Sequence, residues 1–401
     1  KEALIKLKIM RAKLDAIEKA QVEPIAIVGV SCRFGKEGNS AEKFYSMLKN
    51  GTDTIVEVPK DRWDIDEYYD PDPDAPGKMY TREGGFIDDI ASFEPAFFNI
   101  SAREAVAMDP QQRLLLELTW ETLENANIMP SELRGSHGGV FLSGMNIDYG
   151  HLNLDPASID IHTSAGSVAS VAAGRLAYVL GLHGPTMVVD TACSSSLVAT
   201  HLACQSLRRK ECSFAITGGV HLMISPIPTI LECRTRMLSP DGKCKTFDKD
   251  ANGFARGEGG GLVMLKRLSD AINDGDSIRA LIRGTAINHD GNSSGLSVPN
   301  GMAQESVIRE ALQNGQVKAD EISYIEAHGT GTSLGDPIEI GALGAVFSKG
   351  RTKDNPLLVG SVKTNLGHLE GSAGIAGLIK TAVSLSNEGI PPHINLKNLN
   401  P

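Results

Sequence analysis

The feature that most constrains this chain is a plan that occurs twice: an apolar strand, a polar turn and a helix of small residues. The first copy is MVVDTACSSSLVATHLACQSL (187–207), and the second is LLVGSVKTNLGHLEGSAGIAGLIKTAV (357–383). Ala, Gly and Ser recur along both helices, which suits helices that are buried on all sides with close neighbours. Many α/β units share this plan, but its repetition favours two related halves, each with a central sheet and a buried helix.

Short apolar runs, most of them separated by helical stretches, indicate alternating strands and helices. The first run, PIAIVGVSCRF (24–34), has the apolar density of a strand buried on both faces. Residues 101–128 predict a helix interrupted near Pro110. Further strands are expected at 138–144, 186–192, 214–220, 260–266, 322–329 and 356–362. This alternation predicts an α/β fold with buried sheets.

Composition narrows the possible functions. The 401 residues carry a formal net charge of −10, which argues against nucleic-acid binding as the main role. No run of about 18 apolar residues predicts a membrane span, and we find no signal peptide. The six cysteines show no CxxC pair, and a chain of this size does not need disulfides. We expect a cytoplasmic protein, and the start at Lys1 without Met suggests part of a longer polypeptide.

The first 20 residues differ from the rest of the chain. Leu7, Met10, Leu14 and Ile17 follow the a/d spacing of a coiled coil, with charged residues between them. So short a helix is not stable alone, so it must pack on something. Pairing with a partner helix and packing on its own domain are both open.

Cys193 lies where the first strand–turn–helix copy begins its helix. Such a helix end carries partial positive charge and free N–H groups, which favour a thiolate and can hold an oxyanion. The serines that follow, Ser194 to Ser196, keep the turn polar and compact. The alternative is a small buried structural cysteine, but the position favours a nucleophile.

Two histidines lie in settings that suit partners for such a nucleophile. His328 follows a strand in the glycine-rich loop EAHGTGTSLGDPIE (326–339), and His368 precedes the second small-residue helix. His289 is a weaker loop candidate, and the remaining histidines look structural. A zinc site is the competing use of Cys and His, and the local spacings give it little support. We therefore expect no metal.

Lys363 and Glu339 are near these histidines in the sequence, five residues before His368 and eleven after His328. A Lys–Glu pair behind the imidazoles could fix their tautomers and electrostatics. An ordinary ion pair is the alternative, and the sequence leaves both open. The stretch FARGEGGG (254–261) is not a nucleotide-binding motif, because no GK[ST] follows it.

Taken together, these motifs resemble the β-ketoacyl synthase (ketosynthase) family, in the form found in modular type I polyketide synthases. The resemblance covers residues 23–401 and rests on several long motifs in the family's order. They are DTACSSSLVATHLA, EAHGTGTSLGDPIE, VKTNLGHLEGSAG, DPQQRLLLELTWETLENA, MLSPDGKCKTFD and GTAINHDGNSSGLSVPNG.

The resemblance implies a thiolase-like fold with two similar halves in five α/β/α/β/α layers, forming a homodimer. We expect a docking or linker helix at 1–20 and a ketosynthase domain at 21–401, with halves at 21–270 and 271–401. The resemblance also implies that Cys193 takes an acyl chain from the phosphopantetheine arm of an acyl carrier protein. A malonyl-type extender on a second carrier protein then loses CO₂ and attacks the Cys193 thioester.

In this scheme His328 and His368 stabilise the enolate through the extender's thioester carbonyl, and Lys363 and Glu339 support them. Thr330 and Thr332 match positions that line the pantetheine tunnel. No bound cofactor is implied beyond the carrier's phosphopantetheine. The implied partners are the two carrier proteins, an acyltransferase domain, a second copy of the chain and a docking partner for the N-terminal helix.

The sequence also departs from the family pattern. CRFGKEG lacks a proline that usually follows Cys-Arg, and FFNISARE has Asn99 and Ala102 where the family usually has Gly and Pro. The family continues past the final Asn-Pro to a strand and a Gly-Phe-Gly-Gly loop that gates the site, so this end of the fold is expected to be missing.

Three functions other than chain extension remain open. A non-condensing domain that only binds or passes on acyl chains usually lacks a histidine, and both are present here. A scaffolding segment would use the N-terminal helix as its working part. A Cys–His hydrolase would need a base within hydrogen-bond reach of Cys193 and an open water path.

Overall fold

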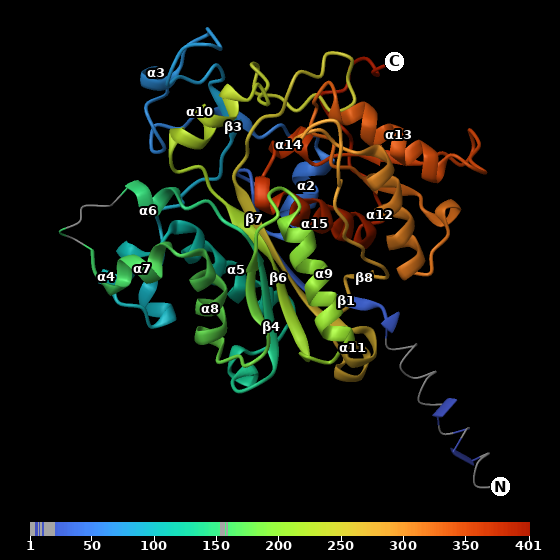
Figure 1. The fold of residues 1–401 in the computed structure, drawn as a ribbon. Coiled ribbons are helices and arrows are strands. Elements are labelled where there is room, and N and C mark those ends of the chain that lie inside the picture. The colour runs from blue at the N-terminus through green and yellow to red at the C-terminus, as the bar shows by residue number, and fades with distance from the viewer. Residues whose placement is uncertain (1–4, 7, 9, 12–20, 153–156, 158) are drawn as a thin grey trace.

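A sheet of six strands forms the centre of the molecule (Figure 1). We describe a computed structural model, which defines residues 5, 6, 8, 10, 11, 21–152, 157 and 159–401. In order across the sheet the strands are β5 (Thr186–Val189), β4 (Gly138–Ser143), β6 (Phe214–His221), β7 (Gly259–Arg267), β1 (Ile25–Phe34) and β8 (Ala280–Ile282). β4, β5 and β6 are mutually parallel, while β7 is antiparallel to β6 and β1. The carboxyl ends of β1, β4, β5 and β6 therefore share one edge.

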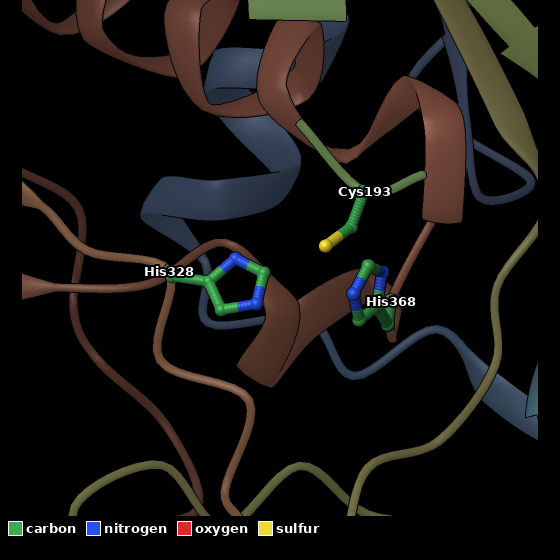
Figure 2. A group of neighbouring side chains, drawn as sticks. All are labelled: Cys193, His328 and His368. Carbon is green, nitrogen blue, oxygen red and sulfur yellow. The ribbon is translucent and has the colours of Figure 1, made fainter. Parts of the chain in front are cut away.

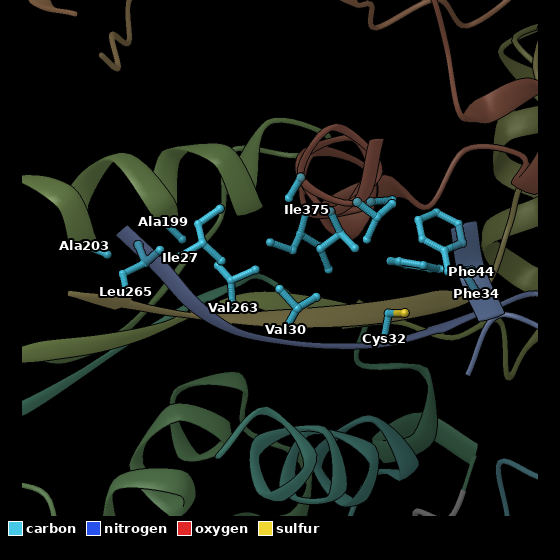
Figure 3. Close-up of a cluster of buried hydrophobic side chains, with 14 of the residues drawn as sticks. Ile27, Val30, Cys32, Phe34, Phe44, Ala199, Ala203, Val263, Leu265 and Ile375 are labelled. Atoms are coloured by element: carbon cyan, nitrogen blue, oxygen red, sulfur yellow. The ribbon is translucent and has the colours of Figure 1, made fainter. Parts of the chain in front are cut away.

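Both faces of this sheet are buried, as the apolar density of β1 predicts. Ile25 and Ile27 belong to a core cluster on one face, whereas Ala26 and Val28 belong to a second cluster on the other. Figure 3 shows the first cluster filling the space between the sheet and two helices. On the other face lie α5 (Pro110–Asn125) and α8 (Ala169–Leu180), which contribute Leu115 and Leu176 to the second cluster.

The two helices over the first face are the small-residue helices of the sequence repeat, α9 (Ser195–Arg208) and α15 (Ala373–Ser386). They approach closely where α15 begins. A Cβ added at Gly374 would lie 2.6 Å from Cγ of Leu197, and the backbone N–H of Ile375 donates to Oγ of Ser196 at 3.0 Å. Small residues are needed here because a larger side chain would separate the helices.

A second, smaller sheet pairs β9 (Tyr324–Glu326) with β10 (Leu358–Gly360) in parallel. Its outer face is covered by α12 (Gly301–Asn314) and α13 (Gly335–Phe347), around a cluster that includes Val346 and Phe347. The order is therefore outer helices, large sheet, central helices, small sheet and outer helices. This α/β arrangement is a thiolase-like fold.

The remaining elements surround these layers. The helices are α2 (Ala41–Lys49), α3 (Ile65–Tyr68), α4 (Ala102–Ala107), α6 (Asp148–Leu152), α7 (Ile161–Ser167), α10 (Pro226–Arg234), α11 (Leu268–Asp274) and α14 (Lys363–Leu366). The strands β2 (Ile55–Glu57) and β3 (Glu83–Gly85) form a separate hairpin pair. In the part of the chain that the structure describes, no helix is both long and apolar enough to cross a bilayer.

The structure confirms the expected strands and the helix break near Pro110, which divides α4 from α5. It also contains strands that the sequence pattern did not indicate, β2, β3 and β8. β8 has only three residues and pairs antiparallel with β1 at the edge of the large sheet. Most of the predicted N-terminal helix (1–20) lies outside the described residues.

Candidate active site

Cys193 lies in the turn between β5 and α9, directly before Ser194, the N-cap residue of the helix. Ala192 has a left-handed backbone conformation (φ 55°), which few non-glycine residues adopt. The turn is held by its own polar groups: the Ala192 N–H donates to Oδ1 of Asp190 at 3.0 Å, and the Thr191 N–H donates to Oγ of Ser195 at 2.8 Å. Such a strained, braced turn presents one side chain in a fixed direction.

The surroundings of the Cys193 thiol act in opposite directions on its pKa. Burial raises the pKa, while the ammonium of Lys363 lowers it. The sequence had suggested that the helix end would favour the thiolate; burial outweighs the nearby positive charge. The resting group is therefore a thiol that must lose its proton when it reacts.

Two imidazoles face this thiol. Figure 2 shows the Cys193 sulfur pointing toward the space between His328 and His368. The sulfur and one ring nitrogen of each histidine all lie within 4.8 Å of one another. The ring centroids are 5.4 Å apart and the ring planes are almost perpendicular, at 85°. The structure thus brings together three residues that are far apart in the sequence.

The orientation of His368 is fixed by the backbone around it. The Glu370 N–H donates to Nδ1 of His368 at 2.9 Å, so this nitrogen is an acceptor and the proton of the neutral ring is on Nε2. The ring also lies against Phe254, with centroids 5.0 Å apart. His368 is therefore a preset N–H donor toward the space it shares with Cys193 and His328.

Both imidazoles are held in the neutral form. Burial lowers the pKa of His368 well below its usual value, and Lys363 and His328 lower it further, against Glu370. Burial and then Lys363 also lower the pKa of His328, to about 3. By surface area His328 is an exposed residue, whereas His368 is only 5% exposed, so burial acts more strongly on His368. Neutral imidazoles can donate hydrogen bonds to a developing oxyanion without bringing a mobile proton.

Glu339 and Lys363 do not form a direct pair. Glu339 instead accepts the backbone N–H groups of His328 and Gly329, at 2.7 and 2.8 Å, and so fixes the turn that carries His328. Lys363 is 4% exposed, and burial lowers its pKa against the opposing charge of Glu326. Glu339 therefore acts on the site mainly through the backbone, and its charge also raises the pKa of Lys363.

A cavity of about 320 Å³ opens beside the thiol. Cys193, His328, Lys363 and Glu326 are among the residues that line it. The hydroxyls of Thr330 and Thr332 lie 3.2 Å apart in the loop after His328, but neither residue lines this cavity. The thiol, one imidazole and the buried ammonium thus share one space that a ligand can enter.

Cys193, His328 and His368 lie close enough together to bind a metal ion, although the local sequence spacing did not indicate such a site. Among the described residues this group offers one sulfur and two nitrogens, too few for a structural zinc site, although catalytic zinc sites also use three protein ligands. The positive charge of Lys363 beside it opposes a divalent cation. The donor set suits acyl chemistry on sulfur better than metal binding.

Comparison with known proteins decides between metal binding and acyl chemistry. The family described as "Beta-ketoacyl synthase, N-terminal domain" matches residues 22–271, and "Beta-ketoacyl synthase, C-terminal domain" matches residues 279–397. The chain belongs to the β-ketoacyl synthase family.

The relatives of this ketosynthase are polyketide synthases. It is 50% identical over its whole length to a phenolphthiocerol/phthiocerol polyketide synthase of Mycobacterium tuberculosis, of which it covers 18%. It is 48% identical over 97% of its length to another phenolphthiocerol/phthiocerol polyketide synthase from the same species, of which it covers 25%. The chain thus spans about a fifth of these relatives, and it is a ketosynthase domain of the polyketide synthase type.

Solved structures agree. A cysteine-to-serine mutant of the ketosynthase from module 6 of the bacillaene synthase of Bacillus subtilis is 40% identical with a TM-score of 0.88. The match covers 94% of this chain and 64% of that one. The oxazolomycin ketosynthase domain OzmH KS7 of Streptomyces albus is also 40% identical, with a TM-score of 0.89 and coverages of 94% and 66%. The fold of the ketosynthase is therefore that of module ketosynthases.

The structure adds residues to the ketosynthase site that the sequence did not single out. Asp336 is buried and accepts the N–H groups of Phe247 and Gly331, at 2.7 and 3.1 Å, which anchors the loop after His328. Glu326 forms a buried ion pair with Lys380 at 2.7 Å. Both residues lie within the sequence motif at 326–339, but nothing in the sequence identifies the groups that they contact.

Proposed function

We propose that this domain extends an acyl chain by decarboxylative condensation on Cys193. The thiol would take the chain from the phosphopantetheine thioester of an upstream acyl carrier protein. The extender would be a malonyl-type thioester on a second carrier protein. The observation that carries this proposal is the Cys193 sulfur facing two neutral imidazoles within 4.8 Å, in a chain of the β-ketoacyl synthase family.

The proposed chemistry follows from charge. Loss of CO₂ from the extender leaves an electron pair on its α-carbon, shared with the thioester oxygen as an enolate. N–H donors on His328 and His368 would stabilise that oxygen. The carbanion would then attack the Cys193 thioester, breaking its C–S bond and leaving the new β-ketoacyl chain on the carrier. Lys363 and Glu339 would support the site through charge and loop geometry, and Thr330 and Thr332 would contact the pantetheine arm.

The domain's partners belong to the same proposal. β5 is an edge strand of the large sheet, and its Met187 is 37% exposed; on the neighbouring α8, Tyr178 is 86% exposed. An apolar edge of this kind suits pairing with a second copy of the chain. An acyltransferase domain would load the extender, and the N-terminal helix would dock a partner. The six cysteines are all unpaired, which supports a cytoplasmic location.

The test is intact-protein mass spectrometry after incubation with an acyl-N-acetylcysteamine thioester. We expect one acyl adduct, mapped to Cys193, and none on Cys193→Ala. Cys233→Ala is the matched control, because this buried cysteine is 1% exposed and should leave the adduct unchanged. Addition of malonyl-pantetheine should then release a β-ketoacyl product. An adduct without extension would favour a non-condensing domain, and no adduct on folded protein would favour a scaffold.

A further inference from the structure

A buried ion pair lies beside His368 and has no part in the chemistry described so far. Nε of Arg256 donates to Oε1 of Glu370 at 2.6 Å, and its Nη1 donates to the hydroxyl of Thr229 at 2.6 Å. The side chain of Arg256 is 2% exposed. Burying a guanidinium this deeply is costly, so its position calls for a reason beyond stability.

The backbone of Arg256 runs alongside His368 as well. The His368 N–H donates to the Ala255 carbonyl at 2.7 Å, and the Gly257 N–H donates to the His368 carbonyl at 2.9 Å. Arg256 and His368 are thus paired as a short parallel bridge. The segment that carries Arg256 holds the main chain of His368, and its side chain holds Glu370 two residues later.

Glu370 connects this ion pair to the imidazole. Its backbone N–H donates to Nδ1 of His368, in a left-handed conformation (φ 44°) that is unfavourable for a glutamate. The ion pair with Arg256 stabilises this conformation. If Glu370 relaxed, Nδ1 of His368 would lose its donor and the ring would lose its fixed tautomer.

Glu370 also brings a negative charge close to His368, and that charge favours the protonated ring. The groups that act on His368 in the opposite direction are Lys363 of α14, His328 of the facing loop and His221 of β6. Glu370 is itself paired with two groups, Arg256 and His221, whose Nε2 lies 3.3 Å from Oε1 of Glu370. The sulfur of Cys193, in the turn before α9, also faces this ring.

Two further carboxyl groups lie behind this cluster. Oε1 of Glu232 on α10 is 4.0 Å from Nε of Arg256, and Asp148 on α6 feels the charges of Arg256, His221 and Glu370. Arg256 is the one arginine among these groups. Without it, three carboxyl groups would face His221 and His368 with no guanidinium to balance them.

We propose that Arg256 is a positioning residue, which holds Glu370 and cancels its charge so that His368 stays neutral with its proton on Nε2. This inference rests on the proposed condensation. It matters there because a protonated His368 would be an acid beside the carbanion. The electron pair left by CO₂ would then take that proton, giving an acetyl thioester from a malonyl one, instead of attacking the Cys193 thioester.

The experiment measures single-turnover condensation from pH 3 to 9, in the full-length protein with Cys193 already acylated and malonyl-pantetheine added, because the low pKa of His368 places the acid limb at low pH. Starting from the acyl-enzyme removes the titration of the Cys193 thiol. Two products are quantified, the β-ketoacyl thioester and the unextended acetyl thioester. If wild type acylates and condenses, the proposed function stands and the variants test this inference alone.

The two single variants should shift the acid limb of the condensation rate in opposite directions. In Arg256→Gln the uncompensated Glu370 should move the limb to higher pH by about one unit. The acetyl fraction should rise several-fold at pH values near the wild-type acid limb. In Glu370→Gln the limb should move to lower pH. The double variant should return the limb close to wild type, and Arg256→Lys should keep it there.

A purely structural ion pair would behave differently. Both single variants would then lower the rate by a constant factor at every pH, with no change in the acetyl fraction; this result, or shifts in the same direction, overturns the proposal. Should Arg256→Gln not fold, Glu370→Gln decides alone, because an unshifted limb in that variant is also incompatible with the proposal.

Discussion

The two sheets of the molecule differ in how firmly they are built. The large sheet has six strands with core clusters on both faces, whereas β9 and β10 form a pair with a smaller cluster. The helices follow the same trend, because α9 buries side chains along its length while no residue of α12 is buried. Cys193 belongs to the large sheet's side, and both histidines follow the smaller sheet.

The smaller sheet alone therefore cannot fix the positions of the two histidines. A segment before β7 helps to fix them by hydrogen-bonding both histidine loops. The Gly253 N–H donates to Gly331 at 3.0 Å, the Thr246 hydroxyl donates to Gly329 at 2.6 Å, and His368 donates to Ala255. The comparison teaches that the better-packed region positions Cys193 directly and the imidazoles through this segment.

The largest expected effect tests whether Cys193 and the two histidines serve different steps of the reaction. His328→Ala and His368→Ala should each lower the condensation rate by about 10²–10³-fold, because each removes a donor to the enolate oxygen. Acylation of Cys193 should persist in both, since the nucleophile and its turn are intact. The measurement compares acyl adduct formation with release of the β-ketoacyl product.

His289→Ala, which changes an exposed loop histidine, is the control and should leave both steps unchanged. If either site variant lost acylation and condensation to the same extent, the division between the two regions would be wrong.

The next effect concerns the contact between the central helices. Gly374→Ala should lower the free energy of unfolding by about 1–3 kcal/mol, because the new Cβ would overlap Leu197 and Ser196. Gly341→Ala in α13 is the matched change, since a Cβ there meets nothing within 4 Å. It should raise the free energy of unfolding by about 0.5–1 kcal/mol through helix propensity alone.

Urea unfolding of both variants measures this difference. Equal effects of the two substitutions would show that the central layer is no more tightly packed than the outer helices.

Much of this arrangement was predictable from the sequence. The alternating apolar runs gave the strands, and the repeated small-residue helices gave the central layer. Cys193 was identifiable from its place at the start of a helix, and His328 and His368 from their glycine-rich surroundings. These are local signals, because each depends on residues within one turn or loop.

The supporting groups could not be assigned in this way. Arg256 and Glu370 are 114 residues apart, and only the fold brings them together. Glu339 was expected beside Lys363, yet it binds two backbone N–H groups instead. A carboxylate has several possible partners of similar strength, and the three-dimensional path of the chain decides among them. Sequence reasoning therefore singled out three residues that the structure brings within 4.8 Å of one another, but it did not find the partners of the groups that hold them.

The smallest expected effect tests whether the second region also acts on the nucleophile through charge. Burial raises the pKa of the Cys193 thiol and Lys363 lowers it, so Lys363→Met removes the largest effect that opposes burial. The thiolate reacts with iodoacetamide, and a higher pKa means less thiolate at any given pH. The pH curve for alkylation of Cys193 should therefore move to higher pH, by about one unit.

Peptide mapping after iodoacetamide treatment follows Cys193 alone, because the other cysteines are at most 2% exposed. Lys353→Met, which removes an exposed lysine from the region after α13, should leave the curve in place. An unchanged curve in Lys363→Met would mean that the two regions meet at the thiol by packing only. A shift to lower pH would contradict the prediction, because the loss of a positive charge cannot by itself stabilise a thiolate.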